Sequence, residues 1–312
     1  MSGWRLVSDV GGSNARFARA AGGVLHDRRT YAVRDFPSFY DAFHRYLSET
    51  GGKEGCASAV VGIAGPIDDG RGKLTNAPWS ADAREIARLL DGAPSTVVND
   101  LQAVALSLPY LAEQDVASLG VAVRANGARR TMLALNVGTG FGAAALVPAG
   151  EGWIANGCEP GHMTLGAVDV EQLAVIEGIP TVEDLLSGRG VKELYARVAR
   201  LKGAEPRQDW SGADIFRNAP MDAVAAETVR HFTLLLGRIA GDLALATGAW
   251  GGVYLCGSVV DGWAEVGDVA QFREAFEAKG PMSDRMPGVF SGIIIPDDAP
   301  LIGLAHLGGD GF

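Results

Sequence analysis

Short apolar segments that end at glycine recur along this chain. Residues 6–8 form one such segment, which ends at Asp9, and residues 15–19 alternate between apolar and polar side chains. Alternation with a period of two predicts a strand, so the glycines between the segments predict a hairpin turn. Residues 131–147 repeat this design around Gly-Thr-Gly. The pattern predicts two related α/β halves, each with a strand–glycine turn–strand unit.

The other elements follow from the same reading of periodicity. Further strands are predicted near residues 30–33, 57–63, 95–98, 252–256 and 289–295. Ser80 is expected to cap a helix at 83–90, after an irregular loop over residues 74–80. Gly237 and Gly241 are expected to permit close packing of a long helix. The predicted helices cover residues 39–46, 83–90, 101–108, much of 169–201, 223–246, 264–278 and 301–307.

The first glycine turn has the composition of a phosphate-binding loop. Gly11 and Gly12 are expected to adopt backbone angles closed to other residues and to leave their N–H groups accessible. Consecutive N–H groups that point one way bind anions, and Asp9 beside them suits a metal ion. An ordinary tight hairpin is the alternative interpretation. The dinucleotide fingerprint G-x-G-x-x-G is absent, and the next element is not a helix.

Polar residues also stand where other predicted strands end. In open α/β sheets ligands bind beyond the carboxyl ends of the strands, where Asp9, Gly65 and Asp100 would all project. Asp100 is a candidate general base, because transfer of a phosphoryl group to an alcohol needs a group that accepts the hydroxyl proton. The alternative is that Asp100 caps the following helix, and both roles can coexist. Its place at a helix N-terminus predicts that it is ionised at neutral pH.

Composition excludes several classes of protein. The net charge of −10 over 312 residues leaves no basic patch for nucleic acid. No apolar run is long enough for a membrane span. The chain reaches its first strand too early to accommodate a signal peptide. The three cysteines lack C-x-x-C spacing, which argues against a disulfide framework or a zinc site and predicts a cytoplasmic protein.

Several motifs in one order resemble the bacterial glucokinase family, within the sugar-kinase, heat-shock-protein and actin superfamily. The motifs are Asp9-Val-Gly-Gly-Ser-Asn-Ala-Arg16, Val98-Asn-Asp-Leu-Gln-Ala103, Gly138-Thr-Gly-Phe-Gly142, Glu159-Pro-Gly-His162, Glu183-Asp-Leu-Leu-Ser-Gly188 and Gly257-Ser258. The resemblance covers nearly the whole chain. It departs from the family at Ser13, where threonine is usual, and at Pro160 and Ser258, where glycine is usual. The last two concern sugar specificity and nucleotide affinity rather than the reaction.

This resemblance implies a two-domain actin-like (ribonuclease H-like) α/β ATPase fold with an interdomain cleft. The expected domains are residues 1–108 plus 296–312, and residues 109–295. The implied reaction is phosphorylation of glucose by ATP with Mg²⁺, with Asp100 as the base and Asp9 holding Mg²⁺ through water. The implied sugar ligands are Asn99, Asp100, Glu159, His162 and Glu183. The implied ATP-binding residues are Ser8, Asp9, Val10, Gly11, Gly12, Ser13, Asn14, Gly138, Thr139, Gly140 and Gly257.

Other interpretations stay open at this stage. Asn76 and Trp79 either line the sugar pocket or serve as a turn residue and a core residue. His26, His44, His231 and His306 are interpreted as structural. The alternatives in function are a kinase for mannose or fructose, a non-catalytic sugar-binding regulator and an actin-like filament protein. The expected partners are glucose and ATP, with no nucleic acid and no membrane, and a homodimer is compatible with the sequence.

Overall fold

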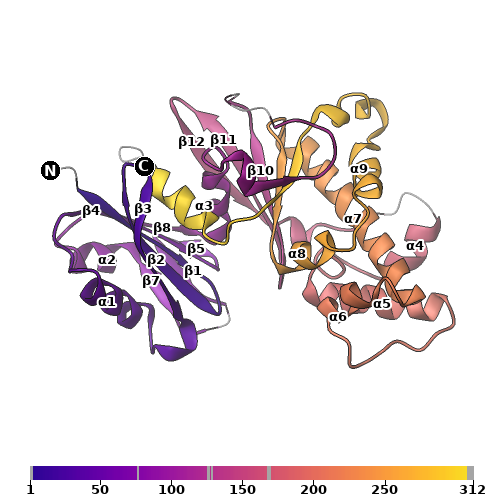
Figure 1. Ribbon diagram of the computed structural model, residues 1–312, viewed down its shortest axis with the longest axis horizontal. Coiled ribbons are helices and arrows are strands. Elements are labelled where there is room, and N and C mark those ends of the chain that lie inside the picture. Colours follow the sequence, from indigo (N-terminus) through magenta and orange to yellow (C-terminus); the bar gives the residue numbers. More distant parts are fainter. Residues whose placement is uncertain (1–2, 76, 125–126, 128, 167–169, 308–312) are drawn as a thin grey trace. The chain divides into compact units, whose positions relative to one another are not determined.

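The computed structural model describes residues 3–75, 77–124, 127, 129–166 and 170–307. The chain forms two compact units (Figure 1). The first contains residues 1–112, 146–157 and 296–312, and the second contains residues 113–145 and 158–295. Residues 146–157 thus group with the first unit, whereas the sequence assigned them to the second domain.

The first unit is built on a five-stranded sheet with the order β3-β2-β1-β4-β8. The predicted hairpin is present, since β1 pairs antiparallel with β2, while β4 and β8 extend the sheet in parallel. The strand bounds are Trp4–Val10 (β1), Asn14–Ala21 (β2), Val24–Ala32 (β3), Cys56–Ile63 (β4) and Ser95–Asn99 (β8).

Alternation of side chains along β1 divides the first unit into two layers. Leu6 and Val10 belong to the core cluster that also contains residues of the helix α1 (Phe39–Glu49). The other sheet face meets α3 (Asp100–Ser107) and α10 (Ala299–His306), whose Gly303 approaches the Ala103 carbonyl closely. An ideal Cβ on Gly303 would lie 2.1 Å from that oxygen. Side chains at successive positions of β1 therefore point to opposite layers.

The irregular loop expected over residues 74–80 is present at 74–75 and 77–79, whereas the cap expected at Ser80 is wrong. The segment before the second helix belongs in part to a three-stranded sheet made of β5 (Ile67–Asp68), β6 (Arg71–Lys73) and β7 (Ser80–Asp82). Ser80 therefore lies in a strand, and Asp82 caps α2 (Ala83–Leu89) by accepting from the Arg84 N–H. Asp is as good a capping residue as Ser, and here it stands directly before the helix.

The second unit has a six-stranded sheet with the order β12-β11-β10-β13-β14-β9. β10 and β11 form the predicted second hairpin, and β10, β13 and β14 run parallel. β9 and β12 were not predicted. The bounds are Val116–Ser118 (β9), Met132–Val137 (β10), Phe141–Ala149 (β11), Gly152–Cys158 (β12), Val253–Cys256 (β13) and Ser291–Ile294 (β14).

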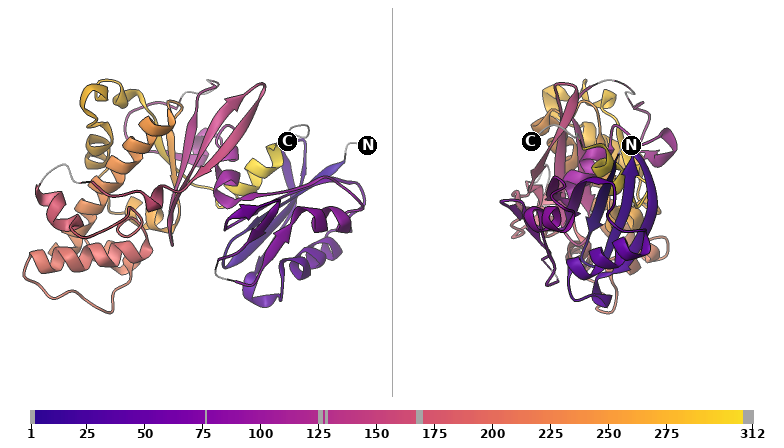
Figure 2. Two further views of the ribbon diagram at one scale, coloured as in Figure 1. Left: turned by 180° about the vertical axis from the view of Figure 1, so that it is seen from behind. Right: turned by 90° about the vertical axis from the view of Figure 1, so that its left-hand side faces the viewer.

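In the second unit, α7 (Ala223–Thr247) lies among other helices, which Figure 2 shows from behind, and its side chains are largely buried. The close packing expected at Gly237 and Gly241 is confirmed, because ideal Cβ atoms there would lie 2.3 Å from the Phe272 and Phe276 carbonyls. The other helices are α4 (Val170–Ile176), α5 (Gly188–Leu201), α6 (Gly212–Asn218), α8 (Ser258–Ala264) and α9 (Val269–Glu277).

The single helix predicted at 264–278 is wrong at its start. α8 ends at Ala264, and α9 begins only at Val269, capped by the Asp268 side chain. Asp268 accepts hydrogen bonds from the Ala270 and Gln271 N–H groups, so it starts a new helix rather than continuing the old one. In the part of the chain that the structure describes, no helix is both long and apolar enough to cross a membrane.

Candidate active site

Asp9 lies near the end of β1, where the hairpin register places Arg16 directly opposite it. The Arg16 Nη1 atom donates to the Asp9 Oδ2 atom at 3.0 Å. Asp9 is only 5% exposed. Burial raises the pKa of the Asp9 carboxyl above its usual value, and the charge and hydrogen bond of Arg16 oppose that rise.

The first glycine turn is held together at its base and open at its tip. The Gly11 N–H donates to the Asn14 carbonyl at 2.9 Å, and the Ser13 carbonyl accepts from Val33. Gly12, Ser13 and Asn14 are exposed, and an ideal Cβ on Gly12 would meet no atom within 4 Å. The Gly11 N–H is therefore already used within the turn, while the tip is accessible to a ligand.

The expectation that Gly11 and Gly12 adopt backbone angles closed to other residues is wrong. Neither Gly11 nor Gly12 has a positive φ, so their backbone angles are open to other residues. What the glycines provide is the absence of a side chain beside the exposed backbone.

Ser8 and Val10 face the core rather than the tip of this turn. Both are buried, and they share the β1 face that contributes to the core cluster around Phe17. The Ser8 Oγ atom has no hydrogen-bond partner among the described residues. Their side chains are thus directed away from the layer that Asp9 meets, because neighbours along a strand point to opposite faces.

Asn99, at the end of β8, is the residue that caps α3. Its Oδ1 atom accepts from the Leu101 N–H at 2.9 Å, and the Gln102 side chain accepts from the Asn99 N–H at 3.1 Å. The Asn99 Nδ2 atom also donates to the Gly65 carbonyl at 3.2 Å. The alternative role of Asp100 as a helix cap is therefore wrong, because a capping box one residue earlier already performs it.

Asp100 occupies the first turn of α3 and is partly buried. Burial, together with the negative charge of Asp9, raises its pKa to about 7. Hydrogen bonds from the backbone and from Asn99 oppose this rise without cancelling it. The helix N-terminus was expected to keep Asp100 ionised at neutral pH, but a pKa of about 7 leaves the carboxyl only partly ionised there. A carboxyl group that titrates near neutral pH is well matched to accept a proton in a reaction.

The second glycine turn joins β10 to β11. The Gly138 N–H donates to the Gly140 carbonyl at 2.9 Å, and Thr139 at the tip is exposed. The Gly138 carbonyl accepts from the Gly188 N–H at 2.8 Å, which ties the turn to the start of α5. Neither Gly138 nor Gly140 has a positive φ. The turn thus exposes the small polar side chain of Thr139, and the hydrogen bond from Gly188 holds its backbone in place.

Gly257 lies next to this turn, because β13 pairs with β10 and both strands end together. Its φ is +104°, and an ideal Cβ would lie 2.4 Å from the Asn136 Oδ1 atom. Here glycine is required both by conformation and by close approach. The structure therefore brings Gly257 together with Gly138, as a nucleotide site in this unit would require.

Glu183 connects the second turn to the 159–162 segment. Its Oε2 atom accepts from the Phe141 N–H at 3.0 Å, and its own N–H donates to the Gly161 carbonyl at 2.9 Å. An ideal Cβ on Gly140 would lie 2.7 Å from that Oε2 atom. The structure thus collects three separate sequence motifs around one carboxylate.

Glu159 directly precedes a short 3-10 helix at residues 160–162, in which Pro160 occupies the first turn and His162 is the last residue. The His162 N–H donates to the Glu159 carbonyl at 3.2 Å. Both side chains are exposed. They are therefore available to a ligand.

Trp79 is a core residue of the first unit. It is 1% exposed, and its Nε1 atom donates to the Phe36 carbonyl at 3.2 Å. This resolves the two interpretations of Trp79 in favour of the core. Asn76 lies outside the described residues.

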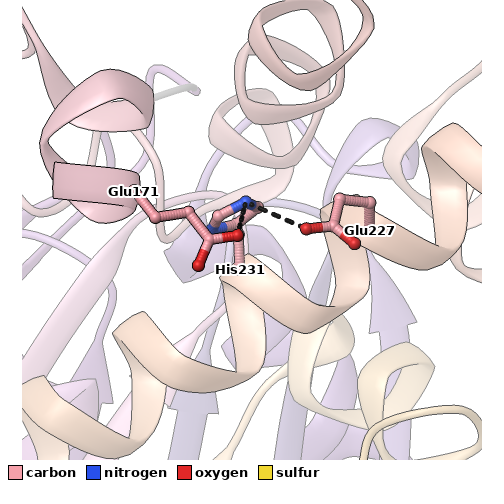
Figure 3. Close-up of side chains that lie close together, drawn as sticks. All are labelled: Glu171, Glu227 and His231. Atoms are coloured by element: carbon pink, nitrogen blue, oxygen red, sulfur yellow. Dashed lines mark ion pairs between the residues drawn. The ribbon is translucent and has the colours of Figure 1, made fainter. Parts of the chain in front are cut away.

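Glu171, Glu227 and His231 form a cluster of potential metal ligands in the second unit (Figure 3). His231 is buried on α7, and its Nε2 atom lies 3.4 Å from a Glu227 carboxylate oxygen. The Arg230 guanidinium, however, forms ion pairs with both glutamates. A permanently charged side chain already neutralises the carboxylates, so the cluster is explained as a contact between α4 and α7.

Two residues that contact candidate site residues were not singled out from the sequence. Arg16 could have been found, because the hairpin register places it opposite Asp9. Arg189 lies 3.1 Å from the Glu183 Oε1 atom, and no motif or periodicity marks it.

The chain is similar to known glucokinases over nearly its whole length. Residues 6–309 match the family model described as Glucokinase. A glucokinase from Chromohalobacter salexigens is 34% identical over 89% of this chain and 88% of its own length. A solved glucokinase from an Antarctic psychrotroph is 30% identical, covers 98% of both chains and superposes with a TM-score of 0.87. A ROK family glucokinase from Streptomyces griseus, solved with glucose and AMPPNP, covers 99% of this chain and all of its own, at 20% identity and a TM-score of 0.60.

Proposed function

Because the chain belongs to the glucokinase family, we propose that it transfers the γ-phosphoryl group of ATP to the 6-hydroxyl of glucose. The predicted two-domain actin-like α/β ATPase fold is confirmed by the likeness to solved glucokinases. The observation that carries the proposal is Asp100, a partly buried carboxyl at the start of a helix whose pKa is raised to about 7.

Asp100 is the proposed general base. The oxygen of the 6-hydroxyl attacks the γ-phosphorus, the bond from that phosphorus to the ADP oxygen breaks, and the hydroxyl proton passes to the Asp100 carboxylate. ADP and glucose 6-phosphate result. The capping box supports this role, because Asn99 and Gln102 form it rather than Asp100. A base of this kind contributes a factor of about 10²–10⁴ to the rate.

The two glycine turns and Gly257 are the proposed ATP-binding elements, together with Asp9. Asp9 and Asp100 are close enough that the charge of Asp9 raises the pKa of Asp100, and a concentration of negative charge beside an open turn suits Mg²⁺. Arg16 donates to the Oδ2 atom of Asp9, and the Oδ1 atom would hold this ion through water. The ion would neutralise phosphate charge in the reaction.

Asn99, Glu159, His162 and Glu183 are the proposed ligands of the sugar hydroxyls. The exposed side chains of Glu159 and His162 are available for this role. Asn99 and Glu183 are each held by a hydrogen bond to another segment of the chain, which fixes their orientation before a ligand binds. Glucose in the Streptomyces griseus protein supports the choice of ligand.

A coupled assay with ATP, Mg²⁺ and a panel of glucose, mannose and fructose tests the proposal. We expect glucose to have the highest kcat/KM. Preference for mannose or fructose would support a kinase for another hexose. Binding of sugar with no ADP release would instead support a non-catalytic regulator. A cytoplasmic location, a homodimer and the domain limits 1–108 plus 296–312 and 109–295 stay predictions.

A further inference from the structure

The Glu183 carboxylate is held from two sides. The Phe141 N–H donates to its Oε2 atom at 3.0 Å, and the Arg189 Nη2 atom donates to its Oε1 atom at 3.1 Å. A carboxylate has about four acceptor positions on its two oxygens, so these bonds leave room for a sugar hydroxyl. With one bond on each oxygen, rotation of the carboxylate about its terminal torsion is restricted.

Arg189 is itself held in place. Its Nη2 atom also lies 3.3 Å from the Asp184 Oδ1 atom. The other Asp184 oxygen accepts from the Thr181 N–H at 3.2 Å and from the Thr181 hydroxyl at 2.6 Å. The backbone beside Arg189 is fixed as well, because the Gly188 N–H donates to the Gly138 carbonyl. The guanidinium is therefore presented to Glu183 from an anchored start of α5.

The position of Arg189 argues against a role in stability. Its side chain is 66% exposed and borders an open hollow of about 350 Å³ lined by Ile179, Pro180 and Glu193. Truncation would leave no buried cavity, and exposed ion pairs contribute little to folding. What truncation would remove is one of the two contacts that orient Glu183.

We propose that Arg189 is a positioning residue that holds the Glu183 carboxylate in its sugar-binding orientation. The inference rests on the proposed function, and it adds a residue that no motif of the sequence marks. Arg189 acts through Glu183, so its removal should weaken glucose binding while ATP binding and folding stay unchanged. Residues of one hydrogen-bonded network couple strongly enough for a loss of about five- to tenfold in affinity.

Calorimetric titration with glucose, and separately with an ATP analogue, tests this on the full chain. Arg189→Ala is expected to raise the glucose Kd about five- to tenfold. Arg200→Ala is the matched control: it removes an arginine of similar exposure, 62%, from the same helix, and its carboxylate partner is Glu193. The thermal midpoints of both variants should match the wild type.

Two further variants separate positioning from a general effect of charge. A single nitrogen of Arg189 makes both contacts, so Arg189→Lys should recover most of the glucose affinity. In a Glu183→Gln background, Arg189→Ala should have little further effect. An unchanged or lower glucose Kd in Arg189→Ala would overturn the inference, as would a larger loss for the ATP analogue. Wild-type protein that binds no glucose would refute the proposed function itself.

Discussion

Replacing Asp100 by Asn separates catalysis from folding in one substitution. Asn is nearly isosteric, and the helix cap is provided by Asn99, so α3 should form unchanged. The amide oxygen can still accept a hydrogen bond from a sugar hydroxyl, but it cannot take the proton. We expect kcat to fall by a factor of about 10²–10⁴ while the glucose Kd changes little.

The same substitution should stabilise the protein at neutral pH. The pKa of Asp100 is raised from 3.8 to about 7, so the folded state binds the proton more tightly than the unfolded state. Folding stability therefore falls as the pH rises from the unfolded pKa to the folded pKa. The full difference corresponds to about 4 kcal/mol. Asn cannot ionise, so the gain in folding stability from Asp100→Asn should be absent near pH 4 and reach its full size above pH 7.

Urea unfolding of the wild type and of Asp100→Asn across this pH range measures the difference in folding stability. Measurements of kcat and calorimetric glucose titrations at one pH accompany it. Asp214→Asn is a control of opposite sign, because hydrogen bonds from Ser211 and the charge of Arg217 lower the pKa of that partly exposed carboxyl. Its replacement should reduce stability above the unfolded pKa. A pH-independent stability difference for Asp100→Asn would refute the raised pKa. Retention of more than about a tenth of kcat would refute its role as the base.

Three further predictions concern the sugar and the pH dependence. Glu159→Ala and His162→Ala should each weaken glucose binding by about 1–3 kcal/mol and leave binding of an ATP analogue nearly unchanged in calorimetry; equal losses for both ligands would assign this loop to another role. The kcat/KM for glucose should rise with pH through about 7, as Asp100 loses its proton, and a flat profile between pH 6 and 8 would contradict this. Gly140→Ala should fold normally but displace the Glu183 carboxylate, because the new Cβ would lie 2.7 Å from its Oε2 atom. Titration with glucose and a thermal melt check this prediction. An unchanged glucose affinity would count against it.

The sequence by itself determined the local pieces of this protein. Alternation around Asp9 predicted the β1–β2 hairpin, and the repeated Gly-Thr-Gly segment predicted its counterpart in the second unit. These predictions succeeded because strand periodicity and turn composition act over a few neighbouring residues. The order of the motifs, read as a family resemblance, indicated the fold and the reaction before any long-range contact was known.

Tertiary structure decided how neighbouring polar residues divide their roles. Asn99 and Asp100 compete to cap α3; the neighbouring Gln102 favours Asn99 locally, and the contact with the distant Gly65 carbonyl adds a tertiary term. The raised pKa of Asp100 depends on burial and on the charge of Asp9, a residue far away in the sequence. Such terms arise only when distant segments pack together, so periodicity cannot predict them.

The surroundings of Glu183 were decided in the same way. Its bonds to Phe141 and Arg189 join one side chain to two different elements, and the resemblance marked the glutamate but not these partners. The small sheet around Ser80 and the break before Val269 also escaped prediction. Short strands and capping choices have weak local signals, because long-range hydrogen bonds and side-chain contacts stabilise one of several locally acceptable structures.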